Sequence, residues 1–114
     1  MSELFTLFGS DAPADEQVSA LLTSADRKAR LSAYAYLYAH PASARIAELV
    51  DAVVVEDTRF GQYWGVRSVR RLVEEDPAAL DAATRLRLEH LATTIEPRSD
   101  AADELRQVLR RTPT

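Results

Sequence analysis

The chain contains no cysteine and only three glycines in 114 residues. Without cysteine there are no disulfides, no thiolate metal sites and no cysteine nucleophile. Gly9, Gly61 and Gly65 fit neither the Walker nor the dinucleotide-binding spacing, so a glycine-rich phosphate loop is also excluded. No apolar run approaches the roughly 20 residues of a membrane span, and the N-terminus lacks the basic region of a signal peptide. We therefore expect a cytoplasmic protein.

The composition predicts one ordinary globular domain covering residues 1–114. Apolar residues make up 46% of the chain and charged residues 28%, and a domain of this length buries roughly 65% of its unfolded surface. The net charge of −4 is unevenly distributed. Residues 1–57 contain 4 basic and 9 acidic side chains, whereas residues 58–114 contain 10 and 9. Arginine outnumbers lysine 13 to 1, which suggests a GC-rich bacterial genome.

The spacing of apolar residues and chain breakers predicts an all-α fold. Apolar side chains recur at helical intervals between proline-containing breaks. The helices are expected at about 14–23, 26–39, 43–55, 60–75, 77–94 and 100–110. Val53, Val54 and Val55 could also form a strand, but no second candidate strand exists to pair with them. Residues 1–13 form an apolar lead-in that packs on the domain or, alternatively, serves as a short linear motif.

An internal repeat organises these helices. Pro41, Pro77 and Pro113 recur at intervals of 36 residues, and each follows the end of an expected helix. The residues before each proline match in kind: Ala33 with Val69 and Leu105, Tyr36 with Leu72 and Val108, and Leu37 with Val73 and Leu109. Between them, Leu49 aligns with Leu86 if one residue is inserted. Stacked helix pairs explain this pattern, although unrelated helical hairpins could have similar spacing.

The repeat unit resembles the HEAT-type helical repeat. Asp57 precedes a Val66-Arg67 pair and Asp100 precedes Leu105-Arg106, which is similar to the second helix of such repeats. The resemblance covers residues 26–111. It implies a right-handed stack of helix pairs that binds a protein, a peptide or occasionally a nucleic acid on one face. More generally, the chain resembles small helical modules of bacterial defence systems, which act as effector-associated or death-fold-like adaptors.

The polar residues give no pattern typical of catalysis or metal binding. His40 and His90 lack a histidine or carboxylate three or four positions later, so neither forms a metal-binding pair on one helix face. The carboxylates at Glu56-Asp57 and at 74–76 lie at expected helix ends, where such groups are usually solvated. No serine lies in a nucleophile elbow. We therefore expect no catalytic residues, no metal and no cofactor.

Two groups in the stretch 57–76 are candidates for partner binding. Arginines at i, i+3 and i+4 share one helix side, and tryptophan and arginine are enriched at interaction hot spots. Trp64 lies opposite Val69 on the helical wheel, so it either packs on a neighbouring repeat or forms an exposed patch. The candidate residues are Phe60, Tyr63, Trp64, Arg67, Arg70 and Arg71.

The sequence thus predicts five or six helices in antiparallel pairs, as a HEAT-like stack or a compact bundle. The expected function is a non-catalytic adaptor or regulatory module that binds another protein or itself. The alternatives are a defence-system adaptor and a nucleic-acid-binding protein that uses the arginine faces. The acidic chain makes nucleic acid the less favoured partner, since its pI is about 5.1.

Overall fold

The computed structural model describes residues 15–111, and within this range the chain is helical with no strand. The helices are α2 (Asp15–Leu22), α3 (Arg27–Ala39), α4 (Ile46–Val54), α5 (Arg59–Glu75), α6 (Ala82–Thr94) and α7 (Asp100–Arg111), with 3₁₀ turns at η1 (Ser43–Arg45) and η2 (Pro77–Ala79). The all-α prediction is confirmed, and the valines at 53–55 end a helix. The apolar lead-in at 1–13 lies outside the described residues.

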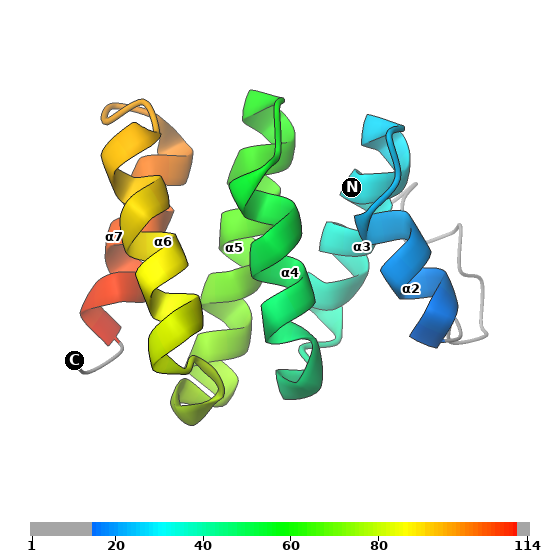
Figure 1. Ribbon diagram of the computed structural model, residues 1–114, viewed down its shortest axis with the longest axis horizontal. Helices are drawn as coiled ribbons and strands as arrows, with labels where there is room; N and C mark the ends of the chain where they lie inside the picture. The colour runs from blue at the N-terminus through cyan, green and yellow to red at the C-terminus, as the bar shows by residue number, and fades with distance from the viewer. Residues whose placement is uncertain (1–14, 112–114) are drawn as a thin grey trace.

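The six helices form two layers of antiparallel hairpins. Figure 1 shows α2, α4 and α6 side by side in front, with α3, α5 and α7 behind them. Successive hairpins pack against one another through both layers, and α5 contacts α3, α4 and α7. The stretch 57–76, which holds the candidate residues, therefore contains α5, the middle helix of the rear layer.

The repeat of 36 residues appears in the rear layer as a repeated helix end. Helices α3 and α5 each end two residues before a proline, because the residue preceding proline is pushed out of the helical region. Helix α7 reaches Arg111, the last of the described residues. Ala33, Val69 and Leu105, which the repeat aligns, are all completely buried. The front layer follows the repeat less closely. Leu86 is 65% exposed rather than buried like its predicted counterpart Leu49.

Polar side chains cap the N-termini of the rear-layer helices. The Asp26 side chain accepts a hydrogen bond from the Lys28 amide at the start of α3, and the Thr58 hydroxyl accepts one from the Gly61 amide at the start of α5. Ser99 Oγ accepts from the Ala102 amide at the start of α7. Each cap satisfies one of the four free amides of a helix N-terminus. Ser24 lies just before this cap, where its hydroxyl accepts a hydrogen bond from the Asp26 amide.

Two glycines on α5 let its neighbours approach closely. A Cβ at Gly61 would lie 2.6 Å from Cδ of Glu56, and one at Gly65 would lie 2.6 Å from Cγ2 of Val53. Val53 is fully buried and has a short branched side chain, so it has little room to shift. The two glycines lie four residues apart on one side of α5. Because they have no side chain, α5 can lie close to the end of α4 and to the residues that follow it.

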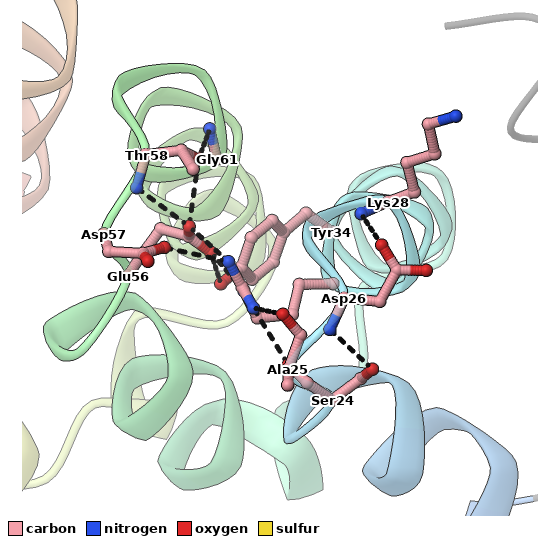
Figure 2. Close-up of polar contacts among 10 residues, drawn as sticks. Ser24, Ala25, Asp26, Lys28, Tyr34, Glu56, Asp57, Thr58 and Gly61 are labelled. Carbon is pink, nitrogen blue, oxygen red and sulfur yellow. Dashed lines mark hydrogen bonds and ion pairs between the residues drawn. The ribbon is translucent and has the colours of Figure 1, made fainter.

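Glu56 joins α3 to the loop between α4 and α5. Its side chain is 1% exposed and accepts hydrogen bonds from Arg30 Nε and Nη2 at 2.9 and 3.0 Å (Figure 2). It also accepts from the Tyr34 hydroxyl at 2.9 Å and from the Thr58 amide and hydroxyl at 3.1 and 2.9 Å. Arg30 further pairs with Asp57 at 3.0 Å. We call these residues (Arg30, Tyr34, Glu56, Asp57 and Thr58) the Glu56 network.

The network keeps the Glu56 carboxylate ionised, although burial alone would favour its neutral form. Burial of Glu56 acts to raise its pKa, but hydrogen bonds from Arg30, Tyr34 and Thr58 outweigh this effect and lower the pKa from 4.5 to about 2. Burial, aided by the charge of Glu56, raises the pKa of Tyr34, so its hydroxyl remains a donor. The expectation that the 56–57 carboxylates are solvated is therefore wrong for Glu56.

The first prediction concerns stability in acid. The folded-state pKa of Glu56 lies below its ordinary value, so its stabilisation is complete above pH 4.5 and is lost as the pH falls towards 2. We expect Glu56→Gln to lower the unfolding free energy at pH 7 by about 2 kcal/mol, after allowance for solvent screening. Its stability should also depend less on pH between 5 and 2.5, as measured by urea unfolding.

The matched control for Glu56→Gln is Asp57→Asn, which removes a neighbouring but exposed carboxylate that also pairs with Arg30. We expect a loss of at most about 1 kcal/mol from this variant, because exposed ion pairs stabilise weakly. Equal losses from the two variants at pH 7 would contradict the assigned role of Glu56.

The second prediction concerns the glycine contact. We expect Gly65→Ala to destabilise the protein by about 1–2 kcal/mol, because crowding against Val53 exceeds the roughly 1 kcal/mol gained in helix propensity. In a Val53→Ala background the same substitution should become stabilising, since the atom 2.6 Å away is gone. Urea unfolding of the four proteins measures the coupling. An unchanged effect of Gly65→Ala in the two backgrounds would disprove the contact.

Candidate functional site

Four of the six candidate residues lie along the outer side of α5. Phe60, Tyr63, Trp64 and Arg67 occur at i, i+3, i+4 and i+7, which places them on one helix face. This face is opposite to that of Val69 and points away from the front layer. Phe60 is 57% exposed, whereas Tyr63 and Trp64 are half-buried and pack against the edge of the core. Trp64 is thus partly buried: its side chain contacts the edge of the core and also remains partly exposed to solvent.

Arg67 lies among three aromatic rings, two from α5 and one from α3. Its Cζ is 5.2 Å from the ring centroid of Tyr38, 5.7 Å from that of Tyr63 and 5.1 Å from that of Trp64. Its Nη1 donates to the Tyr63 hydroxyl at 2.7 Å, and its Nη2 donates to the Tyr38 hydroxyl at 3.5 Å. All three ring distances fall within the range of a cation–π interaction.

The rings also contact one another edge to face. Trp64 packs against Tyr38 at a centroid distance of 5.7 Å and against Tyr63 at 5.6 Å, and Phe60 extends the series at 6.5 Å. Such perpendicular packing fixes the rings relative to one another. Tyr38, Phe60, Tyr63, Trp64 and Arg67 together are called the aromatic–arginine cluster below.

The cluster keeps a positive charge. Burial acts to lower the pKa of Arg67, but hydrogen bonding and charge interactions with Tyr38 and Tyr63 outweigh it and raise the pKa. Within residues 15–111 no carboxylate forms an ion pair with Arg67, which is held by aromatic rings and hydroxyls alone. The cluster therefore combines apolar ring surface with a cation that a partner can reach.

The other two arginines do not join this cluster. Arg70 pairs with Glu74 at 2.9 Å and with Glu104 of α7 at 2.6 Å, and these bonds raise its pKa. Arg71 pairs with Glu75 at 3.1 Å. The three arginines expected to form one basic side are thus divided, and the acidic residues at 74–75 neutralise two of them.

Tyr38 belongs to the cluster but was not predicted. The sequence shows it on an apolar side of the second expected helix, but that pattern does not reveal which residue it meets on α5. The contact depends on how α3 crosses α5, where Ser68 Oγ donates to the Tyr34 carbonyl at 2.7 Å. Tyr38 lies one helical turn after Tyr34, so this crossing brings it to Trp64 and Arg67.

The two histidines lie at the surface, and Asp76 contacts a second loop. His40 is exposed and stacks on Tyr36 at a centroid distance of 4.6 Å, and His90 is exposed on α6. Asp76 accepts from the Ser43 hydroxyl at 2.7 Å, which joins two loops. In the described part of the chain, no three histidine or acidic side chains are grouped closely enough to hold a metal ion.

The comparisons with known proteins found no significant match to this chain. No family model matches the chain, and neither a curated protein nor a solved structure is significantly similar to it. Among residues 15–111, none of the helices is both long enough and apolar enough to cross a bilayer.

The third prediction tests the aromatic–arginine cluster as a structural unit. We expect Arg67→Gln to lower the unfolding free energy by about 1–2 kcal/mol, since each cation–π contact contributes about 0.5–1 kcal/mol. Arg71→Gln, which loses one exposed ion pair, should cost at most about 0.5 kcal/mol. Urea unfolding followed by circular dichroism compares the two, and equal losses would mean that the ring contacts around Arg67 do not stabilise the fold.

Proposed function

We propose that the chain is a small helical interaction module, an adaptor or regulatory subunit without catalytic activity, that binds another protein through the aromatic–arginine cluster. The observation that carries this proposal is the cluster itself. Tryptophan, tyrosine and arginine are the residues most enriched at interaction hot spots. Here they are arranged on one outer helix face, with Phe60 exposed beside them.

The architecture supports the same proposal. We propose that the three hairpins form a HEAT-like stack, in which each unit contacts its neighbours and leaves an extended face for binding. The matching ends of α3 and α5 and the two-layer arrangement support this assignment. The cluster draws residues from α3 and α5, so the proposed binding surface needs at least two adjacent units.

Nucleic-acid binding through the arginine faces has weaker support. That alternative needs several cations free to neutralise phosphates, whereas Arg70 and Arg71 are paired with glutamates. A role as an adaptor in a bacterial defence system is a special case of the proposed function. In either case we propose that the protein acts in the cytoplasm.

The fourth prediction uses photo-crosslinking to test for a partner at the cluster. Benzoylphenylalanine placed at Phe60 should give discrete adducts in a lysate of the native host, and adding unlabelled protein should suppress them. The matched control is the same probe at Leu86, which is 65% exposed on α6 in the other layer. The adducts at position 60 should be lost on Arg67→Glu. Equal adducts from both positions, or none from position 60, would overturn the proposal.

A further inference from the structure

The three helices of the rear layer all begin at the same edge of the molecule, and exposed cations gather there. The starts of α3, α5 and α7 lie together at the top of Figure 1. Arg27 and Lys28 occupy the first turn of α3, Arg59 begins α5, and Arg98 lies just before α7. All four side chains are exposed. We call these four residues the basic edge.

The stability of the helices does not account for the basic edge. A helix N-terminus carries a partial positive charge and favours acidic residues, yet the first turns of α3 and α5 contain no acidic residue. Within residues 15–111, none of the four cations takes part in an ion pair. Residues that break a local rule without a compensating contact are expected at functional surfaces.

Phe60 divides the surface at this edge into two grooves. One groove, of about 320 Å³, lies between the starts of α3 and α5 and is lined by Arg27, Lys28, Leu31 and Phe60. The other, of about 530 Å³, lies between the starts of α5 and α7. Arg59, Arg98 and Asp100 are the charged residues among those lining it. The two grooves thus contain four cations and one carboxylate, although the whole chain has a net charge of −4.

We propose that this edge docks an acidic peptide segment of a partner protein, with an apolar side chain of the peptide against Phe60 and carboxylates on either side at the cations. The proposal rests on the proposed function, because Phe60 belongs to both surfaces. Its main support is charge complementarity. Two pairs of cations, none of which forms an ion pair among residues 15–111, flank one exposed apolar residue, which matches a carboxylate–apolar–carboxylate sequence.

The same spacing favours a peptide over a nucleic acid. A nucleic acid presents a continuous series of phosphates, and its affinity grows with the number of phosphates neutralised. Here the cations form two separate pairs with an apolar side chain between them. Leu31 adds a second apolar contact in the smaller groove. A peptide can alternate between charged and apolar side chains, and a phosphate backbone cannot.

The test uses a short fluorescein-labelled peptide in which a Leu-Phe pair is flanked on both sides by Glu and Asp. We expect saturable binding to the full chain by fluorescence polarisation, weakening as salt is raised. The double variant Arg27→Glu with Lys28→Glu should weaken binding roughly tenfold or more, and so should Phe60→Ala. The control pair Arg110→Glu with Arg111→Glu, an equal charge change at the other end of α7, should leave the affinity unchanged. Circular dichroism confirms that each variant folds.

Control peptides separate the two components of recognition. Replacing the Leu-Phe pair by Ser-Gly, or the acidic residues by glutamine, should weaken binding in each case. No saturable binding of the parent peptide would overturn the proposal. Binding that is equal in wild type, the double variant and Phe60→Ala would also overturn it. Tighter binding of a thymidine oligonucleotide of equal charge would reassign the edge to nucleic acid, and dimerisation abolished by the same variants would reassign it to a second copy of the chain.

The result also distinguishes this inference from the function on which it rests. If position 60 gives partner adducts but acidic peptides do not bind, the interaction module stands and the acidic partner is wrong. If acidic peptides bind in the predicted way but no adduct forms at position 60, the peptide-binding edge stands and the adaptor proposal fails.

Discussion

The contact between α3 and the chain entering α5 holds together the two helices that carry the candidate site. Glu56 is buried there and accepts hydrogen bonds from Arg30, Tyr34 and Thr58. Replacing one member of such a group leaves the others buried without their partners, which makes the contact specific as well as stabilising. Because Tyr34 and Tyr38 are one turn apart on α3, the same contact brings Tyr38 to the rings of α5.

The glycines of α5 and the cluster residues on the same helix lie on different sides of it and have different roles. Gly61 and Gly65 remove side chains where α5 meets Glu56 and Val53. Phe60, Tyr63, Trp64 and Arg67 add large side chains where α5 faces outward. Because α5 contacts α3, α4 and α7, only the side that carries these large residues is left for binding a partner. The rare residues of the chain are concentrated here because close packing and recognition both act on the same helix.

The fold could be read from the sequence in most respects, whereas the site could be read only in part. Proline spacing and apolar periodicity are local signals, and they located the helices and the repeated ends at Pro41 and Pro77. The candidate residues Phe60, Tyr63, Trp64 and Arg67 were found from the sequence, but Arg67 was grouped there with Arg70 and Arg71, from which the structure separates it. Tyr38, the pairing of Arg70 with Glu104, and the burial of Glu56 depend on how segments far apart in the sequence pack together. A single sequence does not contain that information in its local pattern.

The Glu56 network also makes the two junctions of the rear layer unlike each other. The junction of α3 with α5 includes a carboxylate that is 1% exposed, whereas the junction of α5 with α7 combines the completely buried Leu105 and Val108 with an ion pair, Arg70–Glu104, nearer the surface. In a stack of the proposed kind each unit can open separately from its neighbours. Because the pKa of Glu56 lies well below its usual value, we expect its protonation in acid to loosen the α2–α3 hairpin, so that amide hydrogens there exchange with solvent before α5–α7 opens. The cluster spans that junction, so we expect the proposed binding surface to come apart before the domain as a whole unfolds.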